Sequence, residues 1–177
     1  KNHNKSSIME QLTQNQLEAI SIERISYLVT QKGINSTIAH IDLEMVKMKI
    51  MDPEEGLGWT REDCDRAEIE YKRFLQLNKM FPNESIVPNK TMDAVWHQHI
   101  LDTRAYHKDC DAVFGKYFHH FPYFGMRSET DKQDLISSFD QTQVIYFNVF
   151  DEAMNGEDSS KCNSSCNSSG KCSSRDR

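Results

Sequence analysis

One segment of this chain, residues 92–127, gathers most of the side chains that could do chemistry. It holds five of the seven histidines, one cysteine and many aromatic residues. Neutral imidazole and thiolate are ligands that zinc, iron and copper accept in proteins. The segment is therefore a candidate site for Zn, Fe or Cu, and its candidate ligands are His99, His107, Cys110, His119 and His120.

The spacing of the histidines limits which of them can share an ion. On a continuous helix His97 and His99 point about 160° apart, and His99 and His107 lie about 12 Å apart along the axis. Neither pair can bind one ion by itself. Any metal site built on this helix therefore needs a second segment of chain.

The second segment follows Gly115, a residue type that commonly ends helices. If the chain turns back there, His119 or His120 can approach His107 and Cys110, which lie three residues apart on one helix face. Imidazole and thiolate together would make a transition-metal ligand set.

The same region also fits a purely structural interpretation, in which buried polar groups satisfy one another by hydrogen bonds. Asp102 follows His99 by three residues and could accept a proton from that imidazole, which would fix its tautomer. The polar cluster expected from this interpretation consists of Trp96, His97, His99, Asp102, Thr103 and Tyr106.

Catalysis has less support in the sequence than binding. A metal hydrolase needs an open coordination position and a general base, usually Glu or His, but the predicted histidine helix contains no Glu. The chain has no HExxH motif, phosphate-binding glycine loop or nucleophile elbow. Cys110 with His107 as its base is a conceivable nucleophile, although its aromatic neighbours indicate a buried thiol.

The elements that would position these residues are all predicted to be helices. Apolar residues recur at three- and four-residue intervals in five stretches, and no strand-like alternation is long enough for a sheet. Thr60 with Asp63 predicts a capping box at the third helix. We expect an all-α, single-domain bundle of about five helices with the histidine helix at its centre; the stretches are residues 8–29, 38–48, 61–81, 91–114 and 131–150.

The charge and hydrophobicity of the chain argue against two classes of partner, nucleic acids and membranes. The net charge of −6 is spread along 177 residues without a basic face, so nucleic acid is an unfavourable partner. No apolar run reaches the 18 or so residues that span a bilayer, and the first residues lack a signal-peptide core. We predict a cytoplasmic protein that binds no membrane. The first residue is not Met, so an upstream segment could precede this chain, and the oligomeric state stays open.

The last residues differ in composition from the rest. Residues 1–154 are predicted to form the helical domain, whereas residues 155–177 are rich in Ser, Asn and Cys and should be disordered. The tail thiols of Cys162, Cys166 and Cys172 could bind soft metals or be modified by an enzyme, and the tail could equally be a solvated segment without a function.

Residues 71–127 carry a distinctive set of residues, namely Tyr71, Phe74-Leu75, Val87-Pro88, Asp93, Trp96-His97-Gln98-His99, Tyr106, Asp109-Cys110, Phe114-Gly115, His119-His120 and Pro122-Tyr123-Phe124-Gly125. With this set they resemble the glycine-rich domain-containing protein-like family, and its short bacterial members in particular. That family implies a helical domain of uncertain biochemical role, which in plant members is joined to glycine-rich segments and linked to stress or development. This chain has only seven glycines, so roles of the glycine-rich region do not carry over.

The sequence favours a non-catalytic helical module that binds a protein partner and carries a buried histidine-centred polar cluster able to hold a transition metal. Two alternatives stay open. One is a ribosomal-peptide precursor whose cysteine-rich tail is processed by a modifying enzyme. The other is a metal-dependent enzyme that uses the histidine cluster.

Overall fold

The computed structural model describes residues 14–156, and within this range it is all-helical with no strand. The all-α prediction is thus confirmed for the described residues. The count of about five is too low, because two of the predicted helices are each interrupted. The seven helices are α2 (Gln14–Thr30), α3 (Ser36–Ala39), α4 (Glu44–Met51), α5 (Arg61–Met80), α6 (Lys90–Leu101), α7 (Thr103–Phe114) and α8 (Glu129–Phe150).

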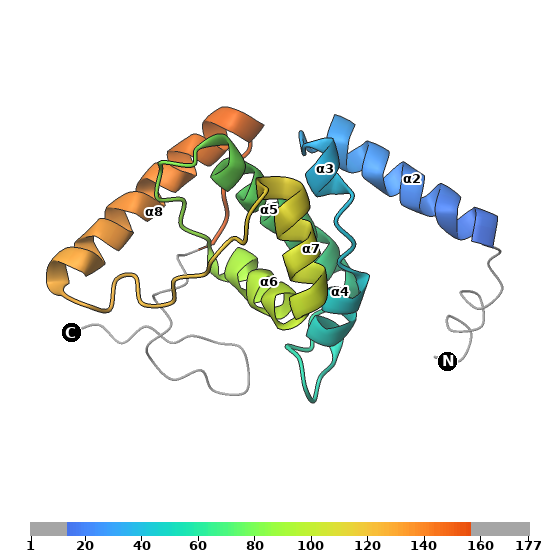
Figure 1. Ribbon diagram of the computed structural model, residues 1–177, viewed down its shortest axis with the longest axis horizontal. Coiled ribbons are helices and arrows are strands. Elements are labelled where there is room, and N and C mark those ends of the chain that lie inside the picture. The colour runs from blue at the N-terminus through green and yellow to red at the C-terminus, as the bar shows by residue number, and fades with distance from the viewer. Residues whose placement is uncertain (1–13, 157–177) are drawn as a thin grey trace.

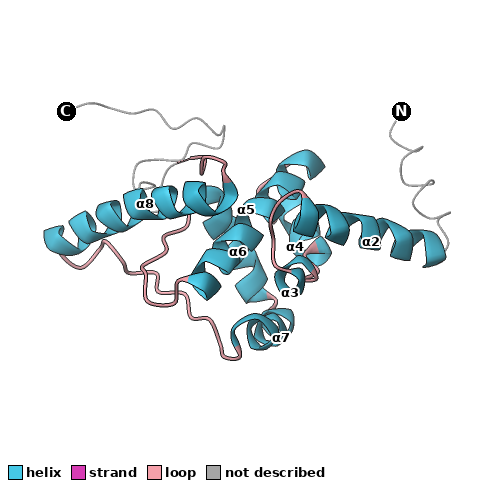
Figure 2. Cartoon of the chain, turned by 90° about the horizontal axis from the view of Figure 1, so that it is seen from above, coloured by secondary structure: helices cyan, strands magenta, loops and turns pink. Residues whose placement is uncertain are grey.

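Helices α5 and α6 form the centre of the arrangement. α5 packs against α3, α4 and α6, while α6 also contacts α4 and α7. Helices α2 and α8 lie at opposite ends of this group (Figures 1 and 2). The apolar side chains of the central helices make one continuous buried core.

Helix α5 begins at the capping box that the sequence predicts. The Thr60 hydroxyl accepts a hydrogen bond from the Asp63 backbone N–H at 3.1 Å, and the Asp63 carboxylate accepts one from the Thr60 backbone N–H at 3.2 Å. The predicted inner face is buried at Ala67, Tyr71 and Phe74. The helical spacing of the apolar residues and the capping box indicate the same helix, so the sequence predicts both the start and the buried face of α5 correctly.

Buried charges also join α4 to α5. Glu68 contacts the Lys47 ammonium at 2.5 Å and the Lys72 ammonium at 2.7 Å, and all three side chains are buried. Lys72 donates a further hydrogen bond to the Ala39 carbonyl, which brings α3 into the same cluster. The cluster thus joins α4 to α5 through the Glu68 carboxylate and α3 to α5 through the Lys72 ammonium.

The predicted single helix over residues 91–114 is wrong, because the chain breaks at Asp102. Asp102 has φ −80° and ψ 73° and accepts a hydrogen bond from the Ala105 backbone N–H, so it ends α6 and caps α7. An aspartate at the N-cap satisfies a free helix donor. The break allows His99 and Asp109 to meet, although a straight helix would separate them by about 15 Å along its axis.

Two other predicted helices differ from the structure in their inner faces. Leu17 and Ile20 on α2 are exposed, and Leu28 is the fully buried residue near its end. The stretch predicted over residues 38–48 is divided into α3 and α4, which leaves Met45 and Met48 exposed. The prediction extended one helical repeat of apolar residues across the boundary between α3 and α4. Because these two helices are oriented differently, one repeat cannot predict which side chains of both are buried.

Helix α8 covers the connector that leads into α6. Its predicted inward residues Leu135, Phe139 and Tyr146 are buried, and Thr142 accepts a hydrogen bond from the Val87 backbone N–H at 3.0 Å. This contact fixes the extended connector, residues 85–88, against α8. The helix is capped by Ser128.

No helix in the described part of the chain is long and apolar enough to cross a membrane. The predicted disorder of the tail and its thiols Cys162, Cys166 and Cys172 concern residues outside the described range, apart from residues 155 and 156.

Candidate metal centre

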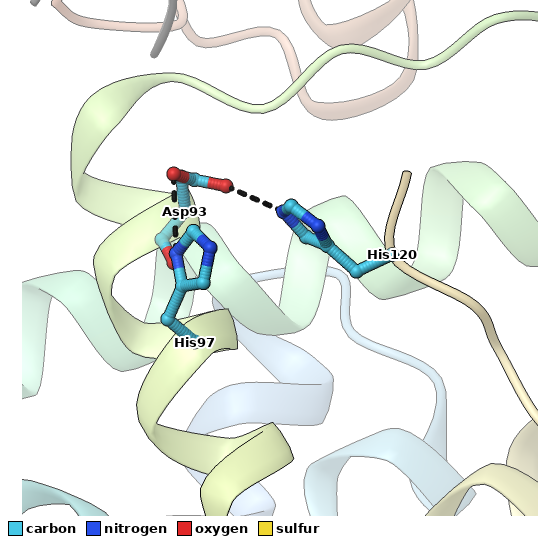
Figure 3. Close-up of side chains that lie close together, drawn as sticks. All are labelled: Asp93, His97 and His120. Carbon is cyan, nitrogen blue, oxygen red and sulfur yellow. Dashed lines mark hydrogen bonds and ion pairs between the residues drawn. The ribbon is translucent and has the colours of Figure 1, made fainter. Parts of the chain in front are cut away.

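Asp93, His97 and His120 come together on the surface of α6. The Asp93 carboxylate lies 3.2 Å from His97 Nδ1 and 3.2 Å from His120 Nε2. Figure 3 shows the carboxylate as the common partner of both imidazoles. One ligand atom from each residue lies within 4.8 Å of the other two. We call these three residues the triad.

The helix supplies two members of the triad by local geometry. Asp93 and His97 are four residues apart in α6, so their side chains lie on one face. The Asp93 carbonyl oxygen lies 2.8 Å from His97 Nδ1. In the tautomer in which Nδ1–H donates to this carbonyl, the lone pair is on Nε2. A metal-binding histidine commonly donates its other N–H in this manner.

His120 reaches the helix because the segment after α7 is held down. Gly115 ends α7 with φ 68°, a conformation that favours glycine. The Tyr106 hydroxyl donates to the Phe118 carbonyl, and Trp96 Nε1 donates to the Tyr106 oxygen at 2.9 Å. The Trp96 ring then packs on His120 at 4.4 Å between ring centroids. We call Trp96, Tyr106 and Phe118 the loop lock.

The triad opens onto a groove of about 940 Å³. The groove lies between α6, the connector at residues 84–88, residues 118–127 and the first turns of α8. Its volume is within the range of small-molecule pockets. Phe121, Tyr123 and Met126 are exposed in the segment that contributes to its rim.

The triad fits the coordination chemistry of a transition metal. Zinc bonds of about 2.0–2.2 Å in a tetrahedral arrangement place the ligand atoms about 3.4 Å apart. The 3.2 Å between the Asp93 carboxylate and His120 Nε2 is close to that value, and the separations of up to 4.8 Å within the triad require a movement of about 1 Å. Two imidazoles and one carboxylate are a recognised set for zinc and non-haem iron, with further positions left for water or another ligand.

A second polar cluster lies on the opposite face of α6 and is closed. The Tyr71 hydroxyl is 2.9 Å from His99 Nδ1, and the Asp109 carboxylate is 3.0 Å from His99 Nε2. His99 is only 1 % exposed. The adjoining cavity is about 10 Å³, which is at the lower limit for one water molecule. Both ring nitrogens have partners, and there is no space for a substrate.

The candidate ligands predicted from the sequence are dispersed by the structure. His107 is exposed and lies 3.4 Å from Asp111, whereas Cys110 is buried, where burial raises the pKa of its thiol. His119 is exposed and contacts the Tyr117 ring. Within residues 14–156 the triad is the one group of three or more such ligands, and it contains His120 from the predicted set.

The predicted polar cluster is likewise divided. Trp96 and Tyr106 belong to the loop lock, His97 to the triad and His99 to the closed cluster. Asp102 caps α7, so the partner of His99 is Asp109. Thr103 is the first residue of α7.

Sequence reasoning missed Asp93 as a candidate ligand. The signal was present, because an aspartate and a histidine four residues apart share a helix face. A search for His and Cys alone passes over it.

Tyr106→Phe should lower the free energy of unfolding by about 1–3 kcal/mol, because the Phe118 carbonyl and the Trp96 indole N–H both lose their hydrogen-bond partner. Urea denaturation measures the change. Tyr117→Phe is a matched control, since Tyr117 is more exposed and a surface substitution usually changes stability by no more than about 0.5 kcal/mol. Equal stability of the two variants would show that the Tyr106 hydroxyl does not form these two hydrogen bonds.

The chain matches the model of the UCP032817-like family over residues 36–158. Neither the curated proteins nor the solved structures include a match to this chain. The matched range contains the triad, the loop lock and the whole of residues 71–127, so the resemblance to the glycine-rich domain-containing protein-like family is wrong. Because the match covers more than half of the 177 residues, the chain belongs to the UCP032817-like family.

Proposed function

We propose that this protein is a helical binding module that holds a divalent transition metal, Zn²⁺ or Fe²⁺, at the triad of Asp93, His97 and His120. The metal would lie at the wall of the groove with at least one coordination position facing it. A role in binding a protein partner, expected from the sequence, would use this same face.

One observation carries the proposal. Three ligand atoms of the types that zinc and iron prefer lie within 4.8 Å of one another, although His120 is 23 residues from His97 in the chain. The third ligand is brought in by the loop lock, a set of buried hydrogen bonds and ring contacts outside the triad. The position of His120 therefore does not depend on the metal.

The charge balance supports a cation at this position. The two imidazoles share one carboxylate, so neutral imidazoles leave the triad with a single negative charge. A bound divalent cation would convert this to a single positive charge. Metal binding requires unprotonated imidazoles and should weaken as the pH falls.

The test is calorimetric titration of the metal-free full chain with Zn²⁺ at neutral pH. We expect one equivalent to bind at the triad, and His120→Ala should weaken this binding by about 100-fold or more, because even outer-shell changes cost 10–100-fold. His119→Ala is the matched control, since it removes the neighbouring exposed imidazole. The same titration of a chain with all three tail cysteines changed to serine separates binding by the body from binding by the tail.

Two results would overturn the proposal. One is a chain with intact triad and serine tail that binds no zinc. The other is an equal loss of affinity in His119→Ala and His120→Ala.

A further inference from the structure

The segment between α7 and α8 contains neither helix nor strand, yet it is held at both ends. At its start the Phe118 carbonyl accepts a hydrogen bond from the Tyr106 hydroxyl of the loop lock. At its end the Asp131 carboxylate accepts hydrogen bonds from the Gly125 backbone N–H at 2.7 Å and the Arg127 backbone N–H at 3.2 Å. Figure 1 shows the segment running from the end of α7 to the start of α8.

The end at α8 is also held by close packing. Asp131 is buried, and its carboxylate forms an ion pair with the Arg127 side chain. Gly125 has φ 84°, a conformation that favours glycine, and a Cβ added there would lie 2.5 Å from the Leu135 side chain. The backbone of the segment therefore packs directly on α8, and its conformation is set without any partner.

This held segment exposes apolar side chains toward the groove, and we call residues 121–127 the aromatic turn. Phe121 is 54 % exposed and Met126 is 71 % exposed, and both line the groove. The Arg127 guanidinium lies 5.2 Å from the centre of the Phe121 ring, and Tyr123 contacts that ring edge to face. Aromatic, Met and Arg side chains are enriched at protein interfaces. A side chain that is already positioned loses little entropy when it binds.

The groove is long and open, which suits an extended peptide. Its walls are two segments without helix or strand, the connector before α6 and the chain that includes the aromatic turn. Its lining continues from the triad on α6 to the first turns of α8. The volume of about 940 Å³ lies near the upper end of the range for small-molecule pockets.

The charges along the groove favour an acidic ligand. Lys132 lines the groove at α8, and its ammonium has no ion-pair partner among residues 14–156. Arg127 pairs with Asp131 but keeps 60 % of its side chain exposed, so some of its five N–H donors face solvent. Outside the triad, the carboxylate that lines the groove is that of Glu84. With a divalent metal at the triad, positive charge exceeds negative charge along the groove, which favours a negatively charged partner.

We propose that the groove binds an extended acidic peptide segment of a partner protein, and that one peptide carboxylate becomes a ligand to the metal at the triad. This inference rests on the proposed function. The carboxylate oxygen displaces a metal-bound water, and no proton or electron is transferred. Carboxylate oxygen is an ordinary zinc ligand. Apolar side chains of the peptide pack on Phe121 and Met126, and a second carboxylate pairs with Lys132.

The test starts with selection of random dodecapeptides, displayed on phage, on the full chain loaded with one equivalent of Zn²⁺. We expect the selected peptides to be enriched in Asp and Glu next to apolar residues. The most enriched peptide is then synthesised with a fluorescein label, and its affinity is measured by fluorescence anisotropy. Removal of zinc should weaken its binding by about ten-fold or more, because the peptide loses one coordinate bond.

Variants of the chain locate the peptide. Phe121→Ser should weaken binding by about five-fold or more, as expected for an aromatic anchor at an interface. Lys132→Gln should weaken it by about two- to five-fold, the contribution of an exposed ion pair. Lys116→Gln is the matched control, because Lys116 is exposed and does not line the groove. All three variants should bind zinc as the unaltered chain does.

The outcomes separate the two proposals. A chain that binds no zinc at the triad overturns the proposed function and this inference with it. If zinc binds but no peptide is enriched, or if the enriched peptides are neutral or basic, the metal site stands and the acidic ligand is overturned. A peptide that binds equally with and without zinc overturns the carboxylate–metal bond, and equal affinity in Phe121→Ser overturns the groove as its site. Binding to phosphatidylserine vesicles without any enriched peptide assigns the aromatic turn to a membrane surface instead.

Discussion

Glu68→Gln is expected to lower the free energy of unfolding by about 3–5 kcal/mol, because it removes the carboxylate that two buried ammonium groups share. Lys72 is 1 % exposed and Lys47 is 4 % exposed. Glu68 Oε1 faces the Lys72 ammonium, and Oε2 faces Lys47 and the Arg24 guanidinium. Glutamine keeps the shape but removes the counter-charge of the buried Lys72 ammonium, whereas Lys47 keeps the carboxylates of Asp65 at 2.8 Å and Glu44 at 3.1 Å.

Urea denaturation at neutral pH measures this change. Glu62→Gln is the matched control, because Glu62 lies in the first turn of the same helix and is exposed. It should change stability by no more than about 0.5 kcal/mol. A Glu68→Gln variant as stable as this control would mean that the buried cluster does not hold α4 against α5.

The same variant should alter the acid dependence of stability. Burial raises the pKa of Glu68, but attraction by Lys72 and Lys47 outweighs it and lowers the pKa from 4.5 to about 2. A carboxyl whose pKa is lower in the folded state contributes stability above pH 4.5 and loses it as the pH falls toward 2. The stability difference between the unaltered chain and Glu68→Gln should therefore be constant near neutral pH and shrink between pH 4.5 and 2.

The fold could be predicted from the sequence wherever helix periodicity and end signals coincide. For α5, Thr60 and Asp63 mark the start and the buried side chains follow at helical spacing. For residues 91–114 the apolar period continues through Asp102, so the spacing alone indicates one helix. The only sequence signal for the break is Asp102, a favourable N-cap residue directly before Thr103. This signal is weak beside a helical spacing of apolar residues that continues without interruption.

The same holds for the candidate site. Two of its members could be predicted from their spacing in the sequence, whereas the third depends on a contact between distant parts of the chain. Asp93 and His97 share a helix face, and this can be read from four-residue spacing. His120 reaches them only because Tyr106 and Trp96 hold the Phe118 backbone. Such a contact depends on the direction of the chain after Gly115, which the sequence does not specify. The same limit explains why Asp109 could not be identified as the partner of His99.

His99→Leu should lower the free energy of unfolding by about 2–4 kcal/mol, because leucine fills a similar volume but leaves two groups without their hydrogen-bond partner. The Tyr71 hydroxyl is fully buried, so it loses a bond that water cannot replace. The Asp109 carboxylate is 19 % exposed and can turn partly to solvent. Most of the cost should therefore come from Tyr71.

The double variant Tyr71→Phe/His99→Leu tests this assignment, since it removes the buried hydroxyl together with its partner. Replacing both members of a buried hydrogen bond by apolar groups costs less than removing one, so the double variant should be more stable than His99→Leu by about 1–2 kcal/mol in urea denaturation. His107→Leu, an exposed histidine on α7, is the control and should be nearly neutral. A double variant less stable than His99→Leu would show that the Tyr71 hydroxyl has a partner other than His99, and the closed cluster would then not be what fixes α6 against α5.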